Sequence, residues 1–203
     1  MKKLIRLSSF VVVAAVALSS VEVAAAQLTG TPVFAAPYRA FRNHEVGGYV
    51  SSAADYSLEG FYGYGSGKFD IQLRGGFAKL DPSGSTVLVG AQARQRVITN
   101  TERFPLDGAF TFGISGGFGD GVDRIFIPVG LSLGRRFLLE GTKTSFVPYV
   151  QPFLGLALSD GDSSLQGGLG LGVDIRLSDV IDLRVGGGIG DIEGVSVGIA
   201  IIR

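Results

Sequence analysis

Large apolar residues alternate with small or polar ones over most of the chain after residue 45. The clearest stretch runs from Leu165 to Leu177, where, apart from Gly167, aliphatic residues alternate with Gly, Gln, Asp and Arg. Successive side chains of a β-strand point to opposite faces, so a period of two predicts strands with one apolar face. The same alternation recurs in residues 69–77, 110–118, 125–133 and 195–201. We therefore expect an all-β fold.

Clusters of Gly, Asp, Ser and Pro divide this region into segments of strand length. Ten strands are expected, at 45–54, 56–64, 68–80, 86–98, 106–118, 123–139, 145–158, 164–177, 181–189 and 195–202. Ala53-Ala54-Asp55 is a poor turn, so eight strands are the alternative if residues 45–64 form one bent strand and an extension. Pro128, Pro148 and Pro152 cannot donate to a β-ladder, and we expect bulges or strand ends there.

Composition excludes several classes of function. The 18 basic and 18 acidic residues balance, which argues against a nucleic-acid-binding surface. The absence of cysteine excludes disulfides, thiolate zinc sites and cysteine nucleophiles. His44 is the only histidine and has no patterned catalytic partner, and the glycine-rich stretch 186–190 is not followed by a helix. We expect neither an enzymatic activity nor a cofactor.

The N-terminus has the pattern of an export signal. Residues 1–26 combine a basic start, an apolar core and Ala24-Ala25-Ala26, which predicts a signal peptide cleaved before Gln27. Residues 27–44 lack periodicity and are expected to form an N-terminal periplasmic arm, followed by a barrel over residues 45–203. No later stretch offers 18 uninterrupted apolar residues, so no membrane-spanning helix is expected.

The distribution of side chains between the two strand faces favours a membrane barrel. One face is continuously large and apolar, whereas the other combines Gly, Ser and Ala with charged residues. A transmembrane barrel turns apolar residues toward lipid and small or polar residues inward, the reverse of a soluble barrel. Most segments are long enough to cross a bilayer at a tilt, and closure removes strand edges that lipid would not tolerate. A secreted soluble β-barrel binding protein is the alternative.

The signal peptide, the alternating glycine-rich strands, the segment from Gly168 to Ser178 and the patterned last strand resemble those of small outer-membrane β-barrel proteins of Gram-negative bacteria. The resemblance covers residues 45–203 and implies a closed antiparallel up-and-down transmembrane β-barrel. It also implies the cell outer membrane as the location, with outer-membrane lipid and lipopolysaccharide as partners and the barrel-assembly machinery as a partner during biogenesis. The chain departs from the family by ending on Arg203 rather than an aromatic residue. Because this family includes pores, structural proteins, adhesins and enzymes, it does not define an activity.

The face expected to line the lumen carries a balanced set of charges. It comprises Glu59, Asp70, Asp174 and Asp182 together with Arg74, Arg94, Arg96, Arg176 and Arg184, and Gln72, Gln92 and Gln151 join them. A selective pore favours one sign of charge at its constriction, whereas opposite charges in a low-dielectric lumen pair with each other. We therefore expect a structural or interaction protein with a largely plugged polar lumen. A narrow pore for small solutes is the alternative.

The turn at residues 178–180 predicts a specific register. A three-residue loop keeps the apolar residues of both strands on one face and sets Arg176 opposite Asp182 and Asp174 opposite Arg184. A short turn here and an even number of strands place both chain ends on the periplasmic side.

The connections at the opposite, outer end are acidic. Carboxylates on neighbouring loops are the ligands that Ca²⁺ or Mg²⁺ prefers. The candidate metal ligands are Asp120, Asp123, Asp160, Asp162, Asp191 and Glu193. Asp is also a common turn residue, and turn chemistry alone explains most of these positions, which is the alternative.

Overall fold

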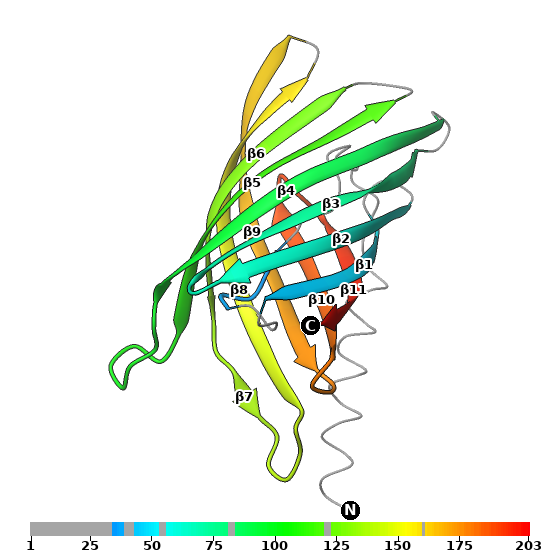
Figure 1. Cartoon of the computed structure of the whole chain (residues 1–203). Coiled ribbons are helices and arrows are strands. Elements are labelled where there is room, and N and C mark those ends of the chain that lie inside the picture. Colours follow the sequence, from blue (N-terminus) through cyan, green and yellow to red (C-terminus); the bar gives the residue numbers. More distant parts are fainter. Residues whose placement is uncertain (1–33, 39–42, 53–55, 81–83, 120–122, 160) are drawn as a thin grey trace, which may run out of the picture.

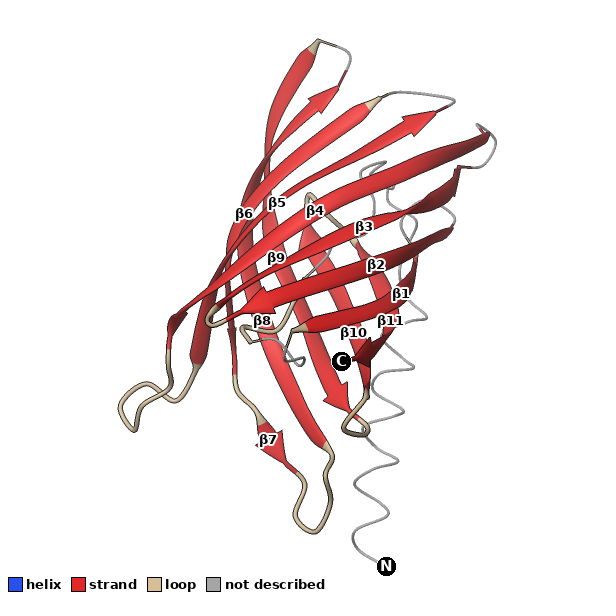
Figure 2. Cartoon of the chain, viewed as in Figure 1, coloured by secondary structure: helices blue, strands red, loops and turns tan. Residues whose placement is uncertain are grey.

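The computed structural model describes residues 34–38, 43–52, 56–80, 84–119, 123–159 and 161–203, and the expected signal peptide lies outside them. The described residues form strands joined by turns and loops (Figure 2). The strands are β1 (His44–Ser51), β2 (Tyr56–Ser66), β3 (Phe69–Leu80), β4 (Gly84–Ile98), β5 (Asp107–Gly119), β6 (Arg124–Gly134), β7 (Phe137–Leu138), β8 (Ser145–Ser159), β9 (Asp162–Arg176), β10 (Ile181–Gly190) and β11 (Gly194–Ile202). Within this part of the chain, no helix is long and apolar enough to span a membrane.

Ten of these strands close into an antiparallel barrel (Figure 1). Each strand pairs with its neighbours in sequence, β1 pairs with β11, and β6 pairs with β8. The two-residue strand β7 pairs with β8 beyond the end of β6. The all-β fold and the closed up-and-down barrel expected from the sequence are confirmed, and the eight-stranded alternative is wrong.

The expected strand 123–139 is interrupted, which corrects the prediction. Strand β6 ends at Gly134, opposite Tyr149, and Arg135 and Arg136 separate it from β7. The next residue of β8 is Pro148, whose carbonyl accepts a hydrogen bond from the Arg135 amide at 3.4 Å. Because proline has no N–H to return a second bond, the ladder stops there.

The other two prolines lie at local gaps in the ladders, as expected. The pairing of β5 with β6 is interrupted alongside Pro128, although Pro128 is paired with Gly155 on the other side. The pairing of β6 with β8 is interrupted alongside Pro152, which is paired with Leu169 of β9. Each of these prolines therefore pairs with a strand on one side. On its other side the ladder is interrupted, so the absence of a proline N–H breaks no regular pairing there.

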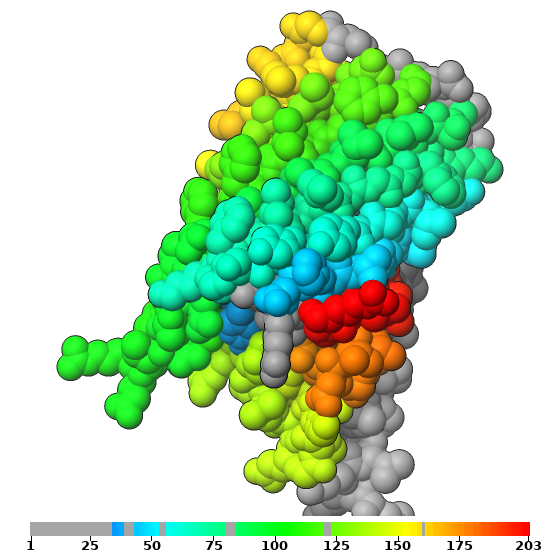
Figure 3. All heavy atoms as spheres, viewed as in Figure 1, coloured from blue at the N-terminus to red at the C-terminus, as the bar shows by residue number. Residues whose placement is uncertain are grey.

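The outer surface is apolar. Large hydrophobic side chains alternate outward along the strands with a third to three quarters of their surface exposed. They include Leu58, Tyr62, Leu73, Phe77, Val89, Phe112, Ile114, Leu154, Leu156, Leu171, Val197 and Ile199. Figure 3 shows the strands packed into a continuous wall. The expected orientation, with the apolar face outward, is confirmed.

The start of β1 and the end of β11 lie at the same end of the barrel. The backbone groups of His44 and Arg203 bond to each other in both directions, at 3.2 and 2.9 Å. The connections β2–β3, β4–β5, β6–β8 and β9–β10 lie at this end, which we call the terminus end (Figure 1). This arrangement agrees with the expectation that both ends of the barrel domain share one side.

Candidate functional site in the barrel lumen

The lumen contains large aromatic side chains, although only small and polar residues were expected there. Tyr49, Phe61, Phe126, Tyr149 and Phe153 are each 4–7% exposed and lie inside the barrel wall. Four of them lie directly opposite a glycine of the neighbouring strand: Tyr49 opposite Gly198, Phe61 opposite Gly47, Tyr149 opposite Gly172 and Phe153 opposite Gly168. A β-carbon at any of these glycines would collide with the facing ring, so the glycines provide the space for the rings.

The charged residues of the lumen form ion pairs between strands. Glu59 pairs with Arg74 at 3.4 Å, Asp70 with Arg94 at 3.0 Å and Asp182 with Arg176 at 2.7 Å, and Glu45 pairs with Arg184 and Asp107 with Arg96. Each of the five carboxylates has a side chain no more than 12% exposed. An unpaired charge at such depth is costly, so each pair neutralises what would otherwise be a strongly unfavourable group.

The expected β9–β10 register is confirmed, with Asp182 opposite Arg176 and Arg184 opposite Asp174. The guanidinium of Arg184, however, donates to Glu45 of β1 and to the Tyr49 hydroxyl rather than to Asp174. Between β10 and β1 lies β11, whose residue opposite Arg184 is a glycine. The arginine can therefore pass over β11 and reach a carboxylate two strands away.

Residues 34–38 lie inside the lumen and bond to the barrel wall. The Tyr149 hydroxyl donates to the Phe34 carbonyl at 3.1 Å, and the Ala35 amide donates to Gln151 Oε1 at 3.2 Å. The Ala35 carbonyl accepts from Ser132 Oγ at 2.5 Å, and the Ala36 carbonyl accepts from Arg94. The donors and acceptors belong to β4, β6 and β8, so this short segment bridges several strands of the barrel.

The side chains of this segment are also enclosed. Ala36 is completely buried, and the Phe34 ring lies 5.5 Å from the Phe153 ring, centroid to centroid. Phe34 also contacts the lumen face at Gly170 and Gly188. Backbone bonds and apolar contacts together define one position for residues 34–36 inside the barrel.

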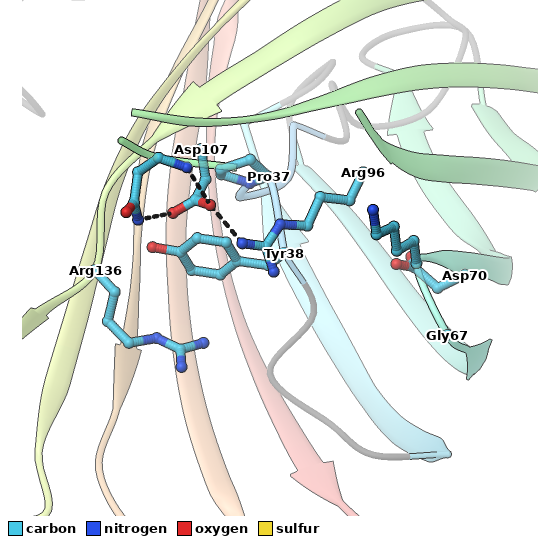
Figure 4. Close-up of a pocket in the computed structure, with 9 residues that line it drawn as sticks. Pro37, Tyr38, Gly67, Asp70, Arg96, Asp107 and Arg136 are labelled. Carbon is cyan, nitrogen blue, oxygen red and sulfur yellow. Dashed lines mark hydrogen bonds and ion pairs between the residues drawn. The ribbon is translucent and has the colours of Figure 1, made fainter. Parts of the chain in front are cut away.

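Tyr38 ends the described part of the segment and lies near two arginines at the terminus end (Figure 4). Its ring centroid is 4.7 Å from the Arg136 guanidinium carbon and 5.5 Å from that of Arg96. Burial raises the pKa of the Tyr38 phenol to about 12, because desolvation of the phenolate outweighs the attraction of the nearby arginines. The phenol is therefore neutral at physiological pH, and the ring offers its face to both cations.

A cavity of about 470 Å³ opens beside Tyr38. Lys68, Arg96 and Arg136 supply three positive charges to its wall, and Asp70 and Asp107 supply two negative ones. Both carboxylates are already engaged by the protein: Asp70 accepts twice from Arg94 Nε, and Asp107 accepts from Arg96, the Asn100 amide and the Asn100 side chain. These contacts with Asp107 are drawn in Figure 4.

The acidic residues at the opposite end remain candidate metal ligands. Asp120 and Asp160 lie outside the described residues. Asp123, Asp162 and Glu193 are exposed, and one Asp191 oxygen accepts a hydrogen bond from the Gly167 amide at 2.8 Å. Within the described ranges no three acidic or histidine residues are grouped closely enough to hold a metal ion. The bond between Asp191 and Gly167 attaches the β10–β11 turn to strand β9, and the divalent-cation site stays a prediction.

Sequence reasoning missed two lumen carboxylates and the whole inner segment. Glu45 is the second residue of β1 and Asp107 the first of β5, so both lie at strand starts, outside the stretches of clear alternation. The signal for Glu45 is the outward pair Val46 and Val50, which places residue 45 on the inner face. Residues 34–38 have no periodicity, and nothing local marks them for the lumen.

Comparison with known proteins finds likeness to solved structures and none to family models or curated proteins. No protein-family model matches the chain, and no curated protein matches it. Among solved structures, the chain is similar to the crystal structure of the β-domain of the Bordetella autotransporter Brka, with 13% sequence identity and a TM-score of 0.42. The alignment covers 79% of this chain and 98% of that chain.

Proposed function

We propose that this chain is a non-enzymatic protein of the bacterial outer membrane whose barrel is closed to solutes by its own side chains and by residues 34–38. In this view it serves as a structural or interaction protein. The observation that carries the proposal is the seating of residues 34–36, whose backbone groups bond to side chains of β4, β6 and β8.

The charge distribution supports a closed lumen over an open pore. Five lumen carboxylates each pair with an arginine, so these pairs leave neither sign of charge in excess, and Asp174 is the lumen carboxylate outside them. A conducting pore requires a solvated path with sites that ions can enter and leave. Here the lumen toward the terminus end is occupied by Ala36, Tyr149 and the pair of Arg94 with Asp70.

The outer surface supports a membrane location. A soluble barrel would leave the outward aromatic and aliphatic side chains in water, over a contiguous area far beyond what soluble monomers usually expose. Lipid is the solvent that matches this surface, and the closed barrel satisfies its backbone hydrogen bonds without help from water. Heat-modifiable migration on a gel, after isolation of outer membranes, tests both barrel and location. Recovery of the protein only in the soluble periplasmic or secreted fraction would favour the soluble alternative.

Planar-bilayer recording of the refolded protein tests closure. We expect no steady unitary currents from the chain, and steady currents would favour the narrow pore. A second recording uses a variant that lacks residues 27–38, with folding verified by heat-modifiable migration. Currents in that variant alone would assign closure to the deleted segment 27–38, whereas silence in both would assign it to the ion-paired side chains.

A further inference from the structure

The cavity beside Tyr38 has a surplus of positive charge. Asp70 is neutralised by Arg94, and Asp107 by Arg96. Lys68 and Arg136 have no ion pair among the residues that the structure describes, so no described carboxylate balances these two positive charges of the cavity. Arg96 also keeps a buried Nε–H with no hydrogen-bond partner among them.

The cations come from three separate parts of the chain at the terminus end. Lys68 lies in the β2–β3 turn, Arg96 near the end of β4, and Arg136 between β6 and β7. Arg136 lies against the face of Tyr38, as Figure 4 shows. Because Tyr38 belongs to the inner segment, seating of residues 34–38 also places Arg136 at the edge of the cavity.

The geometry points to a binding site for a small soluble solute that carries a phosphate group. A phosphate monoester has a charge close to −2 at neutral pH, which matches the two cations that form no ion pair within the described part of the chain. Arginine presents a fork of N–H donors to phosphate oxygens, and lysine adds a mobile point charge. A volume of about 470 Å³ is within the range of pockets that hold small molecules.

The position of the cavity favours a soluble solute over a lipid headgroup. Its wall includes Pro37 and Tyr38 of the inner segment and the inward residues Asp70 and Asp107, so it lies within the mouth of the lumen. Lipid contacts the outside of the barrel, on the other face of the same strands. Under the expected topology this mouth faces the periplasm, where small phosphorylated solutes can reach it by diffusion.

Isothermal titration calorimetry of the refolded chain in a non-ionic detergent tests the site, with inorganic phosphate as the probe. The titration is run at constant ionic strength and pH 7.5, with chloride as the background anion. We expect saturable binding that Lys68→Gln and Arg136→Gln each weaken by about tenfold or more, since each variant removes one charge-assisted contact. Tyr38→Leu should weaken binding as well, because Arg136 loses the ring that holds it.

Arg103→Gln is the matched control. Arg103 is an exposed cation in the β4–β5 connection at the same end, and it does not line the cavity. The variant makes the same change in net charge, and we expect a change in affinity below about twofold, as for an exposed, solvent-screened charge outside the cavity wall. All variants are accepted only if they show heat-modifiable migration.

Three results would overturn the proposal: no saturable phosphate binding, equal weakening by Arg103→Gln, or unchanged binding in Lys68→Gln and Arg136→Gln. A further arm replaces phosphate with phosphatidylglycerol in mixed micelles. Binding of this lipid without binding of inorganic phosphate would assign the cations to headgroups and overturn the soluble ligand. None of these results depends on whether the lumen conducts, so closure of the barrel is judged separately.

Discussion

The ring of Phe34 lies against the backbone of Gly170, in the space that a β-carbon at this position of β9 would occupy. On the adjacent strand, a β-carbon at Gly188 would lie 3.1 Å from Phe34 Cε2. The absence of side chains at two glycines on neighbouring strands thus leaves the space that one aromatic ring occupies. Glycine on the inner face of this barrel therefore does more than fit a narrow lumen, because it leaves room for a segment from outside the sheet.

Gly170→Ala should disrupt the packing of the Phe34 ring against β9. The added methyl group overlaps the Phe34 ring, and overpacking of this kind lowers the free energy of unfolding by about 1–3 kcal/mol. Urea unfolding of the refolded protein measures the change. Gly75→Ala is the control, because the nearest atom to its new β-carbon is 3.8 Å away. In the Phe34→Ala background, where the ring is absent, adding Gly170→Ala should lower the free energy of unfolding little further. If the two losses are additive instead, the contact is contradicted.

Asp182→Ala should destabilise the barrel more than Asp179→Ala. Asp182 is 1% exposed and pairs with Arg176, so its removal leaves a partly buried guanidinium without its carboxylate. The expected loss in urea unfolding is on the order of 3 kcal/mol. Asp179 pairs with Lys143 at 2.6 Å, but both side chains are more than 70% exposed, so little or no change is expected. Equal effects would contradict the burial of the Asp182 pair.

Tyr38 should titrate about two pH units above an ordinary tyrosine, because burial raises its pKa from 10.0 to about 12. The difference in absorbance at 295 nm between the chain and Tyr38→Phe reports this phenol alone. The unfolded phenol ionises first, so stability due to this group is complete below pH 10 and is lost as pH rises toward 12. The phenylalanine variant should escape this loss. A midpoint near pH 10 in the difference titration would place Tyr38 in water.

Asp107→Ala should loosen the β4–β5 connection. Asp107 is 2% exposed and holds Asn100 and Arg96 through its two oxygens. Without it, the Asn100 amide and the Arg96 guanidinium lose their acceptor, and limited proteolysis should cut residues 99–106 faster. Glu102→Ala removes an exposed carboxylate from the same connection and should leave the rate unchanged. The same rate in both variants would show that Asp107 does not order this connection.

The sequence by itself determined the strands and the faces they turn outward. Alternation and turn residues are local signals, and they recur in the strands of this barrel because one face of each strand forms the apolar outside and the other lines the lumen. The β9–β10 register was also predictable, since only a three-residue loop keeps the apolar residues of both strands together. The interruption of the strand at Arg135 and Arg136 was not predictable, because it depends on Pro148 in the partner strand.

Only the tertiary structure decided what fills the lumen. Arg184 reaches Glu45 because barrel closure brings β1 beside β11, although 139 residues separate the two in the chain. Residues 34–38 find their partners up to 116 positions away, and their own sequence has no period that could reveal this. Contacts of this kind are set by the three-dimensional fit between a segment and the glycines, aromatics and charges that face it. A local pattern cannot encode them, because the facing residues come together only when the barrel closes.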